Sequence, residues 1–293
     1  MRCILVLGAT SGIGLALAEK FIAHGAHVIA VGRRQENLDE LVRKHGEEKV
    51  SAVAFDITRL GEIEGFVGRK GMSMLGRQEE QYGDLGMQRR NLKTTSTDNI
   101  HRIIKSHPTL DCVFLNSGIQ RGLDFTKPET IDLDDISLEL TTNYISYIHL
   151  AKYLLPHLQS LSSPTSLIFT TSGLALVPIT RCGNYCASKA ALHHLIVVMR
   201  EQMKNGPGNV KVIEIYPPAV QTELHDEKHQ PDIKNGSSFG MPLDEFTESA
   251  WKGLTEGKDD IPVGTSEKAY EAFEVKRREI FGHMVKSMRG PPV

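Results

Sequence analysis

The sequence predicts an α/β fold, in which one domain is built on a three-layer, doubly wound parallel sheet. Two observations lead to this expectation. Short β-branched runs alternate with longer segments of helical period, which is typical of βαβ units. The first of these runs is followed directly by a glycine-rich turn that opens a helix. The length of 293 residues suits one large α/β core, so we treat residues 1–293 as a single domain with one inserted segment.

Strands and helices are expected to alternate along most of the chain. Strands are expected at 3–7, 27–31, 50–55, 111–115, 166–171, 210–216 and 260–263. Helices are expected at 12–24, 36–45, 134–160, 183–204, 243–255 and 267–287. Within the longest expected helix, Leu140, Tyr144 and Ile148 recur on one face, as in a helix that covers a sheet.

Residues 65–97 do not fit this alternation. The stretch contains six glycines and six basic against three acidic residues, and nothing in it repeats at a helical or strand period. It interrupts a crossover helix that begins near Arg59 and could continue at Ile103. One interpretation is a surface insertion with its own role. The favoured one is a segment that is disordered or absent from the working protein, such as translated non-coding sequence.

Composition and charge exclude several classes of protein. The 34 basic side chains are balanced by 36 acidic ones, which argues against a nucleic-acid partner. No apolar run reaches the roughly 18 to 20 residues of a membrane span, and the first apolar run is too short for a signal peptide. The four cysteines show no disulfide or metal-binding spacing and no HExxH motif occurs, so no metal is expected. Together these features predict a protein of the cytoplasm.

A glycine-rich loop directly follows the first expected strand. Its residues are Gly8, Thr10, Ser11, Gly12, Ile13 and Gly14, with Ala9 between the first two. Glycines allow close backbone approach, and the following helix offers its N-terminal N–H groups to a pyrophosphate. Three glycines also suit a plain tight turn. The strand before them and the helix after them favour a dinucleotide site, as in a Rossmann fold.

Two arginines indicate which dinucleotide binds. Arg33 and Arg34 lie about 20 residues after the glycines, where a dinucleotide fold meets the adenosine ribose. A guanidinium pairs with a ribose 2′-phosphate, whereas a carboxylate at this place would repel it. The expected cofactor is therefore NADP(H). Asp56, at the end of the third strand, either accepts a hydrogen bond from the adenine amino group or caps the next helix.

Tyr185 and Lys189 form the expected catalytic couple. Their i, i+4 spacing in an expected helix places both side chains on one face. A phenol with a pKa near 10 is a poor base at neutral pH, and an ammonium within about 6 Å would lower that pKa. Because this spacing is common by chance, the significance of the couple depends on its context.

The motifs around this couple resemble those of the short-chain dehydrogenase/reductase family, and the resemblance covers nearly the whole chain. The motifs, in the order of that family, are Gly8 to Gly14, Asp56-Ile57, Asn116-Ser117-Gly118, Asn143, Ser172, Tyr185-x-x-x-Lys189 and Pro217-Pro218 through Val220 to Thr222. Ser172 precedes Tyr185 by a little over a dozen residues, as the family requires. Ser117 and Pro218 depart from the commoner Asn-Ala-Gly and Pro-Gly. The stretch that begins at Asn116 and the Gly-Arg-Arg end of the second strand are most similar to the DltE-like branch.

The resemblance implies an oxidoreductase that moves a hydride between nicotinamide and a carbonyl or alcohol carbon. Tyr185 would be the general acid or base, and Ser172 would stabilise charge on the reacting oxygen. Lys189 would lower the tyrosine pKa and bind the nicotinamide ribose, with Asn143 holding a water beside it. The further cofactor contacts would be Ile57, Asn116, Gly118, Pro217, Val220 and Thr222. The family also implies a homodimer or homotetramer packed through helices 134–160 and 183–204.

Residues 219–242 are expected to form a lid over the substrate. The large apolar residues of this lid and of the stretch after Ser172 are Leu224, Phe239, Met241, Leu174, Val177 and Ile179. They indicate an apolar pocket with no charged anchor, so a small, neutral carbonyl or alcohol substrate is expected. The competing interpretation is a non-catalytic NADP(H)-binding regulator of the same fold. The presence of Asn143, Ser172, Tyr185 and Lys189 together argues against it.

Overall fold

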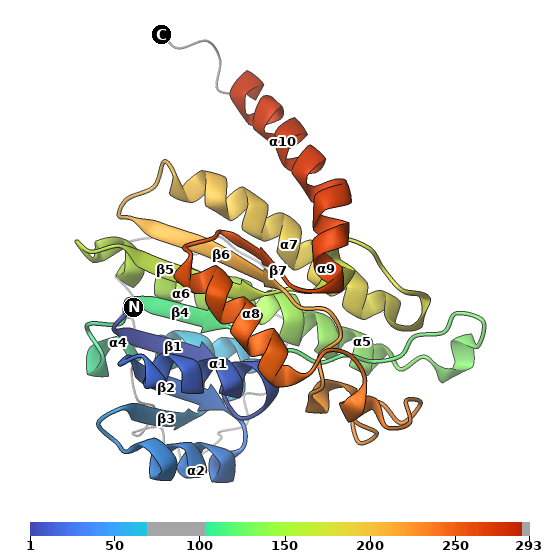
Figure 1. The fold of residues 1–293 in the computed structure, drawn as a ribbon, viewed down its shortest axis with the longest axis horizontal. Helices are drawn as coiled ribbons and strands as arrows, with labels where there is room; N and C mark the ends of the chain where they lie inside the picture. Colours follow the sequence, from blue (N-terminus) through green and yellow to red (C-terminus); the bar gives the residue numbers. More distant parts are fainter. Residues whose placement is uncertain (69–102, 289–293) are drawn as a thin grey trace, which may run out of the picture.

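The centre of the protein is a seven-stranded parallel sheet in the order β3-β2-β1-β4-β5-β6-β7 (Figure 1). The computed structural model describes residues 1–68 and 103–288. The strands are β1 (Cys3–Leu7), β2 (His27–Gly32), β3 (Val50–Ala54), β4 (Cys112–Leu115), β5 (Thr165–Thr170), β6 (Val210–Tyr216) and β7 (Asp260–Pro262). Every strand pairing is parallel, which confirms the expected doubly wound sheet. The strand order reverses between β1 and β4, and ligands bind at such a switch point.

Helices cover both faces of the sheet, which gives three layers (Figure 1). The helices are α1 (Gly12–Ala23), α2 (Gln35–His45), α3 (Ile63–Val67), α4 (Ile103–Ser106), α5 (Leu133–Leu140), α6 (Ser146–Ser160), α7 (Gly183–Met203), α8 (Leu243–Thr255), α9 (Thr265–Ala269) and α10 (Val275–Met288). Helices α3, α4, α6 and α7 pack on one face, and α1, α2 and α8 pack on the other. Among the described residues, no helix combines the length and apolar character that a membrane crossing requires.

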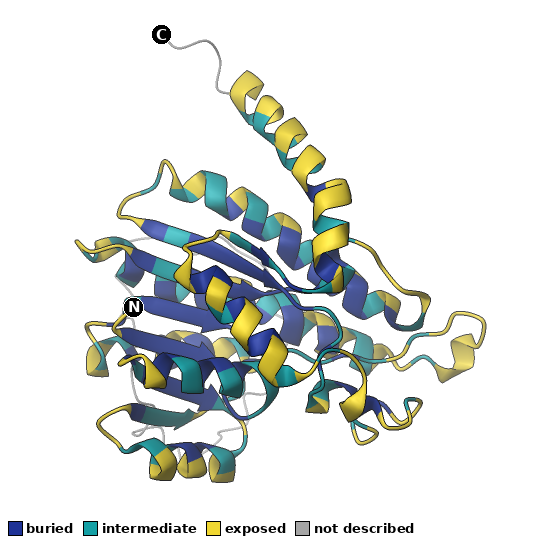
Figure 2. Ribbon diagram, in the orientation of Figure 1, coloured by how far each residue is buried: buried dark blue, intermediate teal, exposed yellow. Residues whose placement is uncertain are grey.

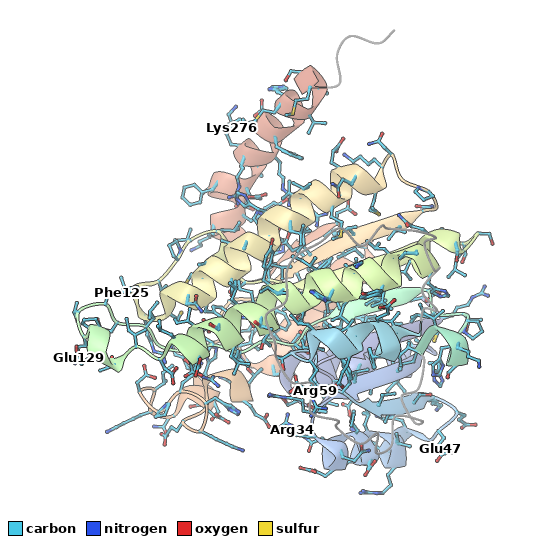
Figure 3. The ribbon with its side chains drawn as sticks, turned by 180° about the vertical axis from the view of Figure 1, so that it is seen from behind. Arg34, Glu47, Arg59, Phe125, Glu129 and Lys276 are labelled. Atoms are coloured by element: carbon cyan, nitrogen blue, oxygen red, sulfur yellow. The ribbon has the colours of Figure 1, made fainter. Side chains whose placement is uncertain are left out.

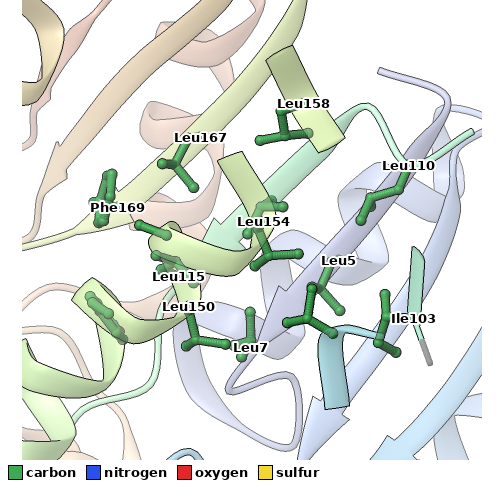
Figure 4. Close-up of a cluster of buried hydrophobic side chains, with 14 of the residues drawn as sticks. Leu5, Leu7, Ile103, Leu110, Leu115, Leu150, Leu154, Leu158, Leu167 and Phe169 are labelled. Carbon is green, nitrogen blue, oxygen red and sulfur yellow. The ribbon is translucent and has the colours of Figure 1, made fainter. Parts of the chain in front are cut away.

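The side chains of β1 point alternately to the two faces of the sheet, which explains why helices cover both faces. Leu5 and Leu7 enter the cluster that Figure 4 shows, together with Leu154 of α6. Ile4 and Val6 enter the second cluster, against α1 and α8. Successive side chains of a strand point to opposite faces, so a strand that is apolar at every position must be buried on both. All five residues of β1 are buried, as the dark centre of Figure 2 illustrates.

The helix expected at 134–160 is not continuous, and this expectation was wrong in its detail. Residues Thr141–Ile145 form a π-helical turn between α5 and α6. A π turn holds one residue more than a regular α-helical turn, and such turns occur most often at functional sites. The helix expected at 267–287 is likewise built from α9, a π turn at Tyr270–Glu274, and α10. The apolar period runs on through both turns, which is why it predicted single helices.

The segment expected as an insertion begins later than predicted. Phe66 and Val67 complete α3, and both are buried in the core beneath the sheet. Phe66 stacks on Phe55 with ring centroids 4.1 Å apart. The start at residue 65 was therefore wrong, because 65–67 are helical rather than a solvated excursion. Residues 69–97 of the expected insertion lie outside the described residues, so its nature stays a prediction.

A buried ion network, which we call the C-terminal anchor, joins the last helix to the sheet. It consists of Glu214 of β6, His193 of α7, Glu274 of the second π turn, and Arg277 and Arg278 of α10. The Nδ1 atom of His193 is 2.9 Å from Glu214 Oε1, and its Nε2 atom is 3.1 Å from Glu274 Oε1. These three side chains are 0% exposed. Both arginines pair with Glu274, so its buried charge is compensated.

We expect the melting temperature to fall as the pH rises above the ordinary pKa of histidine. Burial alone would lower the pKa of His193, but hydrogen bonds to Glu214 and Glu274 outweigh it and raise that pKa above 6.5. A raised folded-state pKa gives stability that is complete below the unfolded pKa and is lost as pH rises through the folded one. The groups that face the imidazole are Glu214, Glu274, Arg277, Tyr216 and His194. Calorimetry from about pH 6 to 9 tests this, and the slope should shrink in His193→Gln.

Candidate active site

A cavity of about 1020 Å³ lies at the carboxyl ends of the strands. Residues that directly follow β1, β4 and β6 line it, namely Gly8, Asn116 and Pro217. The other predicted site residues in its wall are Thr10, Ser11, Gly12, Ile13, Arg33, Arg34, Asp56, Ile57, Gly118, Ser172, Tyr185, Lys189, Val220 and Thr222. The predicted nucleotide and catalytic residues therefore meet in one cavity, with two exceptions, Gly14 and Asn143.

The glycine loop has the backbone geometry that its sequence predicts. Gly8 and Gly12 have φ values of +85° and +53°, which side chains other than hydrogen rarely permit. The N–H of Gly8 donates to the carbonyl of Val31 at 2.9 Å, so the loop is tied to the end of β2. Ser11 precedes α1 without a side-chain cap. The first N–H groups of α1 can therefore donate to a phosphate in the cavity.

Gly14 does not line the cavity, and its assignment as a cofactor contact stays a prediction. A Cβ atom built on Gly14 would lie 2.1 Å from the carbonyl oxygen of Gly8 and 2.6 Å from Asn116 Nδ2. The absence of a side chain lets α1 pack directly on the turn that follows β1. Gly14 thus fixes the position of the glycine loop.

Arg34 lies beside the cavity where the chain leaves β2 for α2 (Figure 3). Its Nη1 atom is 2.7 Å from Glu223 Oε2, and its Nη2 atom donates to the carbonyl of Thr10 at 3.2 Å. Arg33 is exposed and also lines the cavity. Arg33 therefore brings positive charge to the end of β2, as the sequence predicts, whereas the charge of Arg34 is paired with Glu223.

Asp56 does not cap the next helical turn, where Arg59 takes the N-cap place, and its contact with the adenine stays a prediction. Its Oδ1 atom accepts hydrogen bonds from the N–H and the hydroxyl of Thr58, at 3.0 and 2.8 Å. This is the local turn role. The residue also lines the cavity beside Ile57, within reach of a nucleotide base.

Ser172, Tyr185 and Lys189 converge on the middle of the cavity wall. Lys189 Nζ lies 5.7 Å from the centroid of the Tyr185 ring and donates to the carbonyl of Thr170 at 3.0 Å. Ser172 Oγ accepts from the N–H of Leu174 at 3.1 Å, so the hydroxyl is held at the start of the turn after β5. All three side chains are buried. The i, i+4 couple and the serine therefore form one constellation.

Burial dominates the acid–base properties of the couple. It raises the pKa of Tyr185 above its ordinary value, the nearby Cys182 adds to this, and a hydrogen bond with Ser172 acts in the opposite direction. Burial lowers the pKa of Lys189 to about 8, although Glu139 and Glu214 favour its charged form. The expected lowering of the tyrosine pKa by Lys189 stays a prediction, and burial acts against it. A phenol is protonated at neutral pH, so Tyr185 is suited to donate a proton.

Asn143 lies in the first π turn, fully buried and outside the cavity wall. Its Oδ1 atom accepts from the N–H of Ile119 at 3.0 Å, and its Nδ2 atom donates to the carbonyl of Ile119 at 2.9 Å and to Ser188 Oγ at 3.1 Å. A Cβ atom on Gly118 would be 3.4 Å from Asn143 Oδ1 and 3.6 Å from Lys189 Nζ. The asparagine therefore connects the loop after β4 to α7, close to the lysine.

The far end of the cavity is formed by the segment 219–242 and by the stretch after Ser172. Its apolar lining residues are Leu174, Val177, Ile179, Leu224, Ile233 and Phe239. Arg181 also lines this end, but it forms a two-fold ion pair with Asp232 at 2.7 and 2.6 Å. Gln230 donates to Gln120 Oε1 at 3.1 Å. These bonds hold 219–242 against the rest of the site.

Several lining residues escaped the sequence analysis. They are Gln120, Arg121, His225, Lys228, His229, Thr265, Ser266 and Ala269. The last three belong to α9, whose place beside the cavity depends on the packing of the C-terminal segment rather than on any local motif. One residue of the sequence could have indicated that packing. Glu214 stands in the mostly apolar strand Val-Lys-Val-Ile-Glu-Ile-Tyr, and a buried charge in a strand requires a partner from another segment. Within residues 1–68 and 103–288, no group of three or more His, Cys, Asp or Glu is placed to hold a metal ion.

Known proteins similar to this chain support the resemblance. A family model described as short chain dehydrogenase matches residues 2–76 and 89–232. The uncharacterized oxidoreductase DltE of Bacillus subtilis is 27% identical, over 96% of this chain and 95% of that protein. The family resemblance and the similarity to DltE that the motifs predicted are both confirmed.

Solved structures show the same fold. A short-chain dehydrogenase from Sphingobium yanoikuyae in complex with NADPH is similar with a TM-score of 0.71 at 18% identity, over 96% of both chains. A short chain dehydrogenase/reductase from Burkholderia phymatum in complex with NAD is similar with a TM-score of 0.68 at 15% identity, over 100% of this chain and 96% of that one. Because these two proteins hold different nicotinamide cofactors, the choice of cofactor depends on the residues of this chain.

Proposed function

Since the chain belongs to the short-chain dehydrogenase/reductase family, we propose that it is an NADP(H)-dependent oxidoreductase with Tyr185 as its general acid and base. It transfers a hydride between nicotinamide and the carbonyl or alcohol carbon of a small, neutral, largely apolar substrate. One observation carries the proposal: Ser172, Tyr185 and Lys189 line the same cavity as the glycine loop.

The residues of the cavity suit each step of a carbonyl reduction. The bound nicotinamide supplies the hydride. Tyr185, whose phenol is protonated at neutral pH and whose pKa is raised further by burial, donates the proton to the carbonyl oxygen. Ser172 donates a hydrogen bond to the same oxygen and stabilises the charge that develops there. Lys189 would bind the ribose hydroxyls of the cofactor, and Asn143, which lies behind the cavity wall close to Lys189, would hold a water that passes protons to Lys189.

Two features support a neutral substrate and a lid. The far end of the cavity is mainly apolar, and the charge of Arg181 is already paired with Asp232. The segment 219–242 reaches from the nucleotide side, through Glu223, to the substrate side, through Phe239. Turnover confined to strongly anionic compounds would contradict the neutral substrate.

We also propose a homodimer or homotetramer packed through the helices at 134–160 and 183–204. Ile148 of α6 and Val198 of α7 support it, because both are large apolar side chains with exposed fractions of 38% and 42%. Such side chains on neighbouring helices are suited to an interface between copies. Location in the cytoplasm stays a prediction from the sequence.

The preference for NADPH should depend on the two arginines at the end of β2. In the double variant Arg33→Ala, Arg34→Ala, the affinity for NADPH should fall about tenfold or more, since hydrogen bonds to a charged phosphate are each worth about 1.5–3 kcal/mol. The affinity for NADH, which lacks that phosphate, should change little. Fluorescence titration of both cofactors measures the difference. Arg43→Ala, an exposed arginine on α2 outside the cavity, is the matched control.

The proposed function is tested by titrating NADPH against NADH and then screening aldehydes and ketones with the tighter cofactor. We expect tighter binding of NADPH and its oxidation by neutral carbonyl compounds. If NADPH binds tightly but no carbonyl compound oxidises it, the chain is the non-catalytic NADP(H)-binding regulator instead. If neither cofactor binds, both functions are excluded.

A further inference from the structure

We propose that Thr171 and the C-terminal anchor are positioning elements of the active site: through Glu214 they hold the end of β5 that presents Ser172 to the substrate. The proposal rests on the proposed function, since it assigns a role toward the catalytic serine. It adds Thr171, His193, Glu214 and Glu274 to the residues on which the reaction depends, although none of these four is a catalytic residue.

The first step is the contact between Thr171 and the anchor. The Thr171 hydroxyl donates to Glu214 Oε1 at 2.7 Å, and the same oxygen lies 2.9 Å from His193 Nδ1. Thr171 is 1% exposed, and its N–H donates to the carbonyl of Ile215 at 2.9 Å. The hydroxyl also lies 3.3 Å from the carbonyl oxygen of Ile215, so both of its contacts fix the side chain to the neighbouring strand β6, and the contact with Glu214 is the shorter one.

The second step is the place of Thr171 in the chain. It lies between Thr170, whose carbonyl accepts the hydrogen bond of Lys189, and Ser172. His193 also lies one helical turn beyond Lys189 on α7. A displacement of Thr171 would thus move the serine and the acceptor of the lysine together. Displacements of about 1 Å can cost enzymes up to a hundredfold in rate.

The third step is the contact between α9 and the turn that follows Ser172. A Cβ atom on Gly173 would lie 2.3 Å from Ser266 Oγ, so α9 packs directly on the turn that follows the catalytic serine. Ser266 and Ala269 also form part of the cavity wall. Helix α9, the π turn and α10 follow one another without a break, and Glu274 fastens them to α7. The anchor therefore holds the turn at Ser172 from two sides, through Thr171 and through Gly173.

The two ends of α10 differ in their contacts with the rest of the protein. Beyond the anchor, α10 projects away from the body of the protein and has no buried residue (Figures 1 and 2). Glu274 is 0% exposed, whereas Glu279, about one turn further on, pairs with the exposed Lys276. The end of α10 that meets the sheet thus carries the network, and the projecting end offers a matched control.

The experiment compares Thr171→Val with Thr171→Ser. Valine keeps the shape and removes the hydroxyl, and we expect kcat to fall about tenfold while the KM for NADPH stays within about twofold. Serine restores the hydroxyl and should restore kcat to within about twofold. A purely structural role would lower the melting temperature without changing kcat well below it. Wild-type kcat in Thr171→Val overturns the proposal.

A second pair of variants tests the anchor without relying on activity. In Glu274→Gln, amide hydrogen exchange at residues 172–174 should be at least about fivefold faster than in wild type, because the anchored segment loosens. In Glu279→Gln it should be unchanged. If the wild type turns over no carbonyl compound, the proposed function fails, and exchange in Thr171→Val and Glu274→Gln still decides this inference. Unchanged exchange in both variants overturns it, and if Glu274→Gln cannot be purified, unchanged exchange in Thr171→Val overturns it.

Discussion

Replacing Tyr185 with phenylalanine should abolish turnover and leave NADPH binding nearly intact. The substitution removes one hydroxyl and keeps the ring, which packs with Cys182 and Cys186 in a small buried cluster. A positioned general acid is worth about a hundredfold to ten-thousandfold in rate, so kcat should fall at least about a hundredfold. NADPH oxidation with the best carbonyl substrate measures turnover, and fluorescence titration measures binding.

Tyr153→Phe provides the control for that loss. Tyr153 is a half-buried tyrosine of α6 whose hydroxyl lies 3.5 Å from Glu64, outside the cavity. Removing its hydroxyl should leave kcat within about twofold of wild type. Full activity in Tyr185→Phe would contradict the assignment of Tyr185 as proton donor, and an equal loss in both variants would indicate a general effect of losing a phenol.

Replacing Gly14 with alanine should destabilise the protein and abolish tight nucleotide binding together. The added Cβ would lie 2.1 Å from the carbonyl oxygen of Gly8, which is backbone and cannot turn away like a flexible side chain. Overpacking in a rigid place costs about 1–3 kcal/mol or more. We therefore expect a fall of several degrees in the melting temperature, and a displaced α1 whose N-terminus no longer meets the phosphates.

Gly282→Ala is the matched control for the glycine variant. Gly282 lies in α10, and a Cβ atom added to it would have no neighbouring atom within 4 Å, so alanine meets no obstacle there. Because alanine has the higher helix propensity, the protein should be unchanged or gain about 0.5–1 kcal/mol. A Gly14→Ala protein that melts and binds NADPH like wild type would show that α1 does not need its close approach to Gly8.

The sequence predicted those residues of the site whose positions follow from their place after a strand or from their spacing in a helix. The glycine loop, Arg33 and Ser172 each follow a strand, and the carboxyl ends of parallel strands meet at one edge of a sheet. Tyr185 and Lys189 share a helix face by their spacing alone. These rules, together with the family resemblance, predicted the residues that line one cavity.

The parts that the sequence did not predict depend on contacts between distant segments. No motif of the sequence singled out His193, and its place between Glu214 and Glu274 became visible only in the fold. The raised pKa of Tyr185 comes from burial among residues of other elements, which no spacing reveals. The π turn at Thr141–Ile145 was missed because an apolar stripe continues across it.

That π turn means that the length of the helix pair matters as much as its composition. A regular helix turns each residue by about 100° relative to the next, so a chain one residue shorter between Thr141 and Ile145 would close into an ordinary helix. Such a deletion would restore regular hydrogen bonds along α5 and α6. It would also rotate Asn143 away from Ile119 and Ser188, or rotate α5 relative to α6. A regular helix over residues 134–160 would therefore not hold Asn143 in its contacts with Ile119 and Ser188.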